Sequence, residues 1–144
     1  MKILLALTAL LTITVLLAVD RASGVTYVNH EKVAAALSKG GPLVTAPDLL
    51  VSGSYRDKAG QVEVHDKETD VIYVVEGTAT FVTGGRMVGG KMTRPGQLMG
   101  SDIIGGQTHH LSKGDVIVVP ATTPHWFKEV PQSVSYYVVK VLKQ

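Results

Sequence analysis

The chain has 144 residues, with 14 lysines and arginines against 12 aspartates and glutamates, and it contains no cysteine. This length predicts a single domain, and a net charge of +2 without a basic run argues against a nucleic-acid partner. The lack of cysteine excludes disulfides and thiolate chemistry, so the fold must rest on a hydrophobic core.

The N-terminal segment, residues 1–24, has the pattern of a secretory signal peptide. Lys2 precedes 17 uncharged, mostly apolar residues at 3–19, and the small residues Ala22 and Gly24 follow. We therefore expect cleavage after Gly24 and a secreted or periplasmic protein. The alternative is an uncleaved anchor, because 17 residues are close to the length that spans a bilayer. Only through this segment do we expect contact with a membrane.

The segment 25–48 predicts one helix and a lead-in strand. Asn29 is a suitable helix N-cap, and Gly40 is a suitable stop. The apolar stripe between them is narrow, so we expect the helix to pack on the outside of a larger structure; it consists of Val33, Ala36 and Leu37. The lead-in strand is predicted at Leu43–Ala46.

The remaining residues, 49–144, predict short strands separated by turns. These strands are Leu49–Arg56, Gln61–His65, Asp70–Gly77, Thr78–Thr83, Val116–Pro120, His125–Phe127 and Ser133–Leu142. We expect Thr78–Thr83 to close a hairpin with Val71–Glu76. We expect residues 86–112 to form a long excursion that covers a pocket, contacts a second subunit or remains a surface loop. His109 and His110, near its end, are expected to be exposed.

Polar side chains converge at two of these strands. A strand directs residues i and i+2 to one side, so Glu63 and His65 point the same way. The polar connection after His65 lets the chain reverse and brings Asp70 beside them, with Ile72 and Val74 continuing that face deeper in. Two carboxylates and an imidazole at one place indicate a metal site or an acid–base site, or else a solvated strand end with ordinary charges.

A second group of residues has the spacing of a known motif. Gly114, Pro120 and His125 stand as in the second conserved motif of the cupins, which they resemble. Thr122 replaces the second glycine of that motif, and Glu129 stands where asparagine is usual.

The first cupin motif is matched more loosely. Aligned on Gly77, the chain has Glu63 in place of the first histidine, His65 as the second histidine, and Asp70 in place of the glutamate. Both motifs occur in the expected order, and the resemblance extends over roughly residues 49–142.

The resemblance to cupins implies an all-β fold: an antiparallel jelly-roll barrel over residues 49–144, with one short helix outside it. It also implies a divalent metal ion, Fe, Mn, Zn or Ni, held by Glu63, His65, Asp70 and His125. Phe127 shares a face with His125 and is expected to line the pocket with Ile72 and Val74. Arg56 joins them if the polar side of its strand faces inward, and is otherwise a solvated surface arginine.

Three classes of function stay open, each with a small molecule as ligand or substrate. One is a secreted metal-dependent dioxygenase, isomerase, decarboxylase or lyase. Another is a metal-free cupin pocket, where His65 and Glu63 act as an acid–base pair or the pocket serves as a ligand-binding sensor module. The third is a storage or structural protein. We also expect a homodimer, because Ser133–Leu142 and other peripheral strands need their edges covered.

Overall fold

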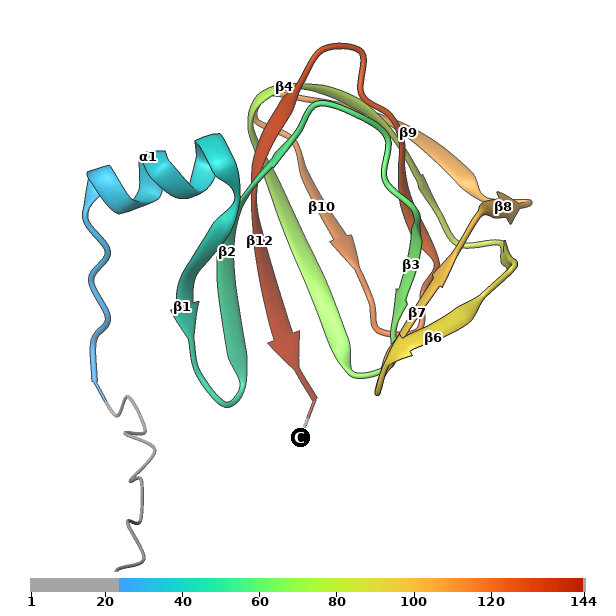
Figure 1. Cartoon of the computed structure of the whole chain (residues 1–144), viewed down its shortest axis with the longest axis horizontal. Coiled ribbons are helices and arrows are strands. Elements are labelled where there is room, and N and C mark those ends of the chain that lie inside the picture. The colour runs from blue at the N-terminus through green and yellow to red at the C-terminus, as the bar shows by residue number, and fades with distance from the viewer. Residues whose placement is uncertain (1–23, 144) are drawn as a thin grey trace, which may run out of the picture.

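The computed structural model describes residues 24–143; residues 1–23, which hold nearly all of the predicted signal peptide, and residue 144 lie outside the described part. The described chain contains one helix, α1 (His30–Lys39), and twelve strands. The strands are β1 (Gly41–Thr45), β2 (Leu49–Arg56), β3 (Val62–His65), β4 (Glu68–Thr83), β5 (Arg86–Val88), β6 (Lys91–Arg94), β7 (Gln97–Gly100), β8 (Asp102–Ile104), β9 (Gln107–Ser112), β10 (Val116–Val119), β11 (His125–Glu129) and β12 (Val134–Leu142). This confirms the predicted all-β fold with one short peripheral helix (Figure 1). Within residues 24–143, no helix is long and apolar enough to cross a membrane.

Ten of the strands form one curled antiparallel sheet. Its order is β1-β2-β12-β4-β11-β3-β7-β6, and β9 and β10 also pair with β4. β5 and β8 form a separate two-stranded sheet. In Figure 1, β1, β2, β12 and β4 lie side by side, while β3, β7 and β6 form the facing wall. The two walls enclose a common interior, as a jelly-roll barrel does.

Strand β4 belongs to both walls. Its residues 68–77 pair with β12, whereas Thr78–Thr83 pair with β9. Gly77 lies at the change of partners with a φ of +84°, and a Cβ at this position would collide with the carbonyl oxygen of Ser133. The glycine therefore bends the strand instead of ending it. The predicted hairpin between Val71–Glu76 and Thr78–Thr83 is wrong.

Two other expectations about strand placement are corrected. Residues 86–112 are not a long excursion: they form β5 to β9, and β7 pairs with β3 while β9 pairs with β4. Strand β12 has β2 on one side and β4 on the other. The open edge from which we expect a homodimer is therefore absent at this strand.

The hydrophobic core fills the interior between the two walls. It consists of Ile72, Val74, Ala79, Phe81, Leu111, Val119, Phe127, Val134 and Tyr136. The ring of Phe127 lies between two others, with centroids 4.7 Å from Phe81 and 4.8 Å from Tyr136. Aromatic pairs at such distances contribute about 0.5–1.5 kcal/mol beyond the area they bury. This row of rings gives the site a rigid floor.

Helix α1 lies where the sequence predicts it. Asn29 Oδ1 accepts a hydrogen bond from the Lys32 amide at 3.0 Å, and Gly40 follows the last turn with a φ of +76°. The helix rests on β2 at Gly53, where a Cβ would come within 2.8 Å of Ala36. The next residue of β2 faces the interior, so the helix covers the outer face of the sheet.

Candidate functional site

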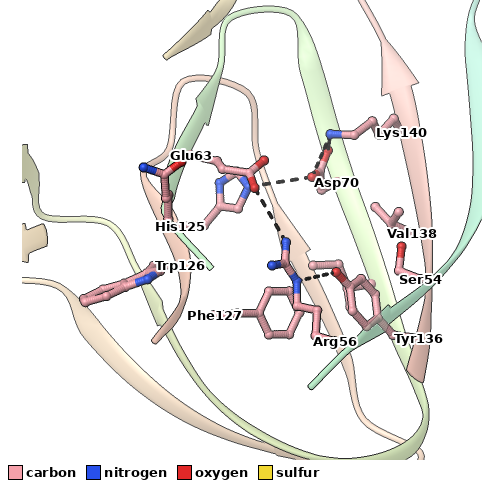
Figure 2. Close-up of a pocket in the computed structure, with 12 residues that line it drawn as sticks. Ser54, Arg56, Glu63, Asp70, His125, Trp126, Phe127, Tyr136, Val138 and Lys140 are labelled. Carbon is pink, nitrogen blue, oxygen red and sulfur yellow. Dashed lines mark hydrogen bonds and ion pairs between the residues drawn. The ribbon is translucent and has the colours of Figure 1, made fainter. Parts of the chain in front are cut away.

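A cavity of about 170 Å³ opens on the inner face of the barrel, between β2, β3, β4, β11 and β12 (Figure 2). Its lining combines charged, aromatic and aliphatic side chains: Ser54, Arg56, Gln61, Glu63, Asp70, Ile72, His125, Trp126, Phe127, Tyr136, Val138 and Lys140. A concave site with a few convergent polar groups on an apolar wall is the usual form of a small-molecule site.

His65 lies at the centre of the polar cluster and is 3% exposed. It does not line the cavity itself, but contacts residues that do. Its Nε2 is 3.6 Å from Glu63 Oε2 and 3.5 Å from Asp70 Oδ2, and its Nδ1 is 3.5 Å from Glu68 Oε2. Within residues 24–143, neither ring nitrogen has a hydrogen-bond partner. Buried polar atoms are nearly always paired, so this imidazole is suited to a ligand that the protein alone does not supply.

His125 belongs to the same cluster, and its two ring nitrogens have different surroundings. Its Nδ1 lies 3.0 Å from the carbonyl oxygen of Thr123. A carbonyl can only accept, so Nδ1 carries the proton and the lone pair of a neutral ring is on Nε2, 3.7 Å from Asp70 Oδ2. Burial lowers the pKa of His125, opposed in part by Thr123 and Asp70. A neutral ring held through its other nitrogen is the form in which histidine binds metal ions.

The turn before His125 contains an unusual backbone conformation. Thr122 has a φ of +69°, the only positive φ outside glycine among the described residues. Its amide donates a hydrogen bond to the His65 carbonyl at 2.7 Å, which ties this turn to β3. A β-branched residue is strained at positive φ. The strain falls where the family motif has its second glycine.

Two residues of the cluster were missed by sequence reasoning, Lys140 and Glu68. The Lys140 ammonium lies 2.8 and 3.0 Å from the two oxygens of Asp70 and 2.9 Å from Glu68 Oε2. Burial raises the pKa of Asp70, but His65 and Lys140 outweigh it, so the pKa is lowered. The pKa of Glu68 is lowered likewise, chiefly by Lys140 against the cost of burial. Strand alternation could have indicated Lys140, because it follows Tyr136 by four residues on the same strand and therefore faces the same side.

The four predicted metal ligands meet, but they fall into two groups. Glu63, His65 and His125 offer ligand atoms that all lie within 4.8 Å of one another, and so do His65, Glu68 and Asp70. Ligand atoms about 2.1 Å from one ion are at most about 4.2 Å apart. Small side-chain rotations therefore suffice in the first group. In the second, Lys140 already holds both carboxylates.

The remaining predicted site residues lie as follows. Arg56, Ile72 and Phe127 line the cavity. Val74 does not: it pairs with Tyr136 and is completely buried in the core, beyond the cavity floor. Trp126, which alternation directs away from His125, is at the cavity's edge and donates its indole N–H to the Gly60 carbonyl at 2.8 Å.

The two adjacent histidines stand apart from the site. Both belong to β9 and not to a loop. His109 is half buried, with Nε2 2.9 Å from Thr83 Oγ1, and His110 is exposed. Neither belongs to a candidate metal group among residues 24–143.

A curled antiparallel sheet around a buried histidine–carboxylate cluster defines the class of the protein as a jelly-roll barrel with a candidate metal site. A family model described as cupin matches residues 20–143. The chain therefore belongs to the cupin family. A search of the curated proteins found no match.

Solved structures share the fold at low sequence identity. A conserved protein of unknown function from Streptococcus pyogenes has 18% identity and a TM-score of 0.51, and the alignment covers 72% of each chain. A protein from Bacillus halodurans has 17% identity and a TM-score of 0.53, with 72% of this chain and 69% of that one covered. The cupin domain of Schizosaccharomyces pombe Cnp3 has 11% identity and a TM-score of 0.53, with 72% and 59% covered. These likenesses concern the fold alone.

Proposed function

We propose that the protein binds a divalent metal ion through Glu63, His65 and His125 and uses it to act on or bind a small organic molecule in the cavity. The observation that carries this proposal is His65, a buried imidazole with both nitrogens unpaired among the described residues. Two imidazoles and one carboxylate suit Fe, Mn, Zn or Ni. Asp70, held by Lys140, orients the cluster instead of joining the first set of ligands.

The chemistry of this site divides between the ion and the chain. A bound ion would supply Lewis-acid or redox chemistry of the kind found in dioxygenases, isomerases, decarboxylases and lyases. The chain's own residues position the ligand: Phe127, Ile72 and Val138 offer an apolar wall, and the polar cluster closes one end. Without the ion, Glu63 would face the cavity with His65 Nε2 3.6 Å behind it, and the two would act as the acid–base pair of the metal-free pocket.

Equilibrium dialysis of the chelator-treated protein against each of the four ions tests this proposal. We expect one ion per chain at saturation, with His65→Ala and His125→Ala each weakening binding by at least tenfold, because each removes one of three ligands. His109→Ala and His110→Ala are matched controls that should bind like the wild type. Equal binding by the site and control variants would refute the proposal.

A metal-free pocket that binds a ligand without turning it over is the second candidate. The observation that favours it is Lys140, whose ammonium contacts both Asp70 and Glu68 and compensates one of their two negative charges without any ion. A panel of small organic acids, sugars and diketones distinguishes the candidates: turnover that depends on metal supports the enzyme, whereas binding unaffected by chelation supports the sensor module.

We also propose that the protein is exported. The support is the uncharged run at residues 3–19 with small residues behind it, which lies outside the described part. N-terminal sequencing of protein from the periplasm or medium should begin near Val25. Intact Met1 on soluble cytoplasmic protein would contradict export.

We propose that two copies associate through the outer face of β12, β4 and β10, beside the part of the wall that α1 covers. Tyr73, Val116, Val118 and Val141 are 44–61% exposed there, and Val116 pairs with Tyr73. A two-fold interface brings one patch onto its own copy, so an uncharged apolar patch meets no repulsion. Sedimentation should show a dimer that Val118→Glu dissociates. Met92→Glu changes a somewhat more exposed position on β6 and should leave the dimer intact. A monomeric wild type at micromolar concentration would exclude the dimer.

A further inference from the structure

Two cationic side chains, Lys140 and Arg56, line the cavity, and they differ in how fully their donors are paired. Lys140 is satisfied, because its ammonium is shared between Asp70 and Glu68 at 2.8–3.0 Å. Arg56 is not: its Nε donates to the Tyr136 hydroxyl at 2.9 Å, while its Nη2 stays 3.6 Å from Glu63 Oε1, beyond hydrogen-bond distance. One cation in the lining therefore still has donors to offer to a ligand.

The guanidinium of Arg56 is held in place before any ligand arrives. Its carbon lies 4.9 Å from the centroid of the Phe127 ring, and Tyr136 fixes its Nε edge. Figure 2 shows the group standing in the cavity between Glu63 and Tyr136. A planar, fixed guanidinium presents parallel N–H donors that match the two oxygens of a carboxylate.

The charge balance changes when the polar cluster engages a cation. Arg56 and Lys140 carry two positive charges in the cavity lining, and Glu63 and Asp70 carry two negative ones. Asp70 is held by Lys140, so only Glu63 compensates Arg56. A cation bound through Glu63 would withdraw that compensation and leave Arg56 facing the cavity unpaired, which favours an anionic ligand.

We propose that the cavity binds a small aliphatic monocarboxylate, with its carboxylate on Arg56 and its carbon chain against Ile72, Phe127 and Val138. The size follows from the volume: about 170 Å³ at about 30 Å³ per water holds roughly six heavy atoms. The apolar wall favours a carbon chain over an inorganic anion. This inference places the ligand in the cavity of the proposed function, but it does not require the ion.

Calorimetric titration of the chelator-treated protein with propionate tests the inference, and its neutral isostere propionamide is the control ligand. We expect propionate to bind at least tenfold more tightly than propionamide, and Arg56→Gln to abolish that difference. Arg56→Lys keeps the charge but loses the planar donors, so its preference for propionate should lie between those of the wild type and Arg56→Gln. Arg86→Gln removes an exposed arginine of β5 that does not line the cavity, so it should bind like the wild type.

Glu63→Gln is expected to change the affinity for propionate in the direction opposite to Arg56→Gln. It removes the anion that competes for Arg56, so it should tighten propionate binding to the metal-free protein while weakening metal binding. Failure of metal binding with the propionate preference intact would refute the proposed metal site and leave this inference standing. Equal affinities for propionate and propionamide, unchanged affinity in Arg56→Gln, or phosphate binding as tightly as propionate would each overturn it.

Discussion

The largest effect on stability away from the core is predicted for Lys140→Met. The substitution replaces the aliphatic stem of lysine with one of similar size and leaves Asp70 and Glu68 without their shared cation. Removing one partner of a buried ion pair costs about 3–5 kcal/mol. Lys140 is 19% and Glu68 14% exposed, so water compensates part of this, and we expect a loss of about 2–4 kcal/mol in the free energy of unfolding.

Urea unfolding at pH 7 measures this loss, and Lys113→Met is the matched control. Lys113 also has a carboxylate partner, Glu76 at 2.7 Å, but both side chains are about two-thirds exposed, at 68% and 69%. Its removal should leave the midpoint of unfolding unchanged.

The pH dependence gives a second check on Lys140→Met. The folded pKa values of Asp70 and Glu68 lie below their usual 3.8 and 4.5, so the stabilisation is complete above those values and is lost as pH falls through the folded ones. The gap between wild type and variant should therefore narrow as the pH falls below 4.5, toward and through the lowered folded pKa values. A variant that unfolds like Lys113→Met, or a gap independent of pH, would refute the role given to Lys140.

Three further predictions concern the barrel around the site. In chelated protein, the free energy of unfolding should decrease as the pH is lowered from 6.5, by up to about 1.4 kcal/mol per pH unit. The reason is the lowered pKa of His125, which lets the unfolded chain take up a proton before the folded one does. His125→Gln should remove this slope in a denaturant series, and an unchanged slope would contradict the prediction. Gly77→Ala should destabilise the protein by more than 2 kcal/mol, roughly the cost of a clash plus a positive φ, and should lower the thermal midpoint; an unaltered midpoint would mean that the bend is not required. Thr122→Gly should raise the unfolding free energy by about 1 kcal/mol by relieving strain at positive φ, whereas a loss would show that the threonine side chain stabilises the turn.

The local part of the site could be predicted from the sequence. Alternation along one strand places Glu63 and His65 on one side, and the short connection returns Asp70 to them. These relations depend on a few consecutive residues, so a period of two is enough to derive them.

The non-local part could not be predicted in the same way. Lys140 reaches Asp70 because β12 pairs with β4 in a register that matches these two residues, and 70 positions separate them. Gly77 was interpreted as a strand end because glycine usually interrupts strands. Only the position of Ser133 and the change of partner strands turn it into a bend.

The most direct test of the proposed metal site is elemental analysis of the chain purified without added metal and without an affinity tag. The account predicts about one divalent ion per chain in the wild type and its loss in a folded His125→Ala variant. A wild-type protein that holds no divalent ion, or a His125→Ala variant that keeps its full metal content, would contradict the account.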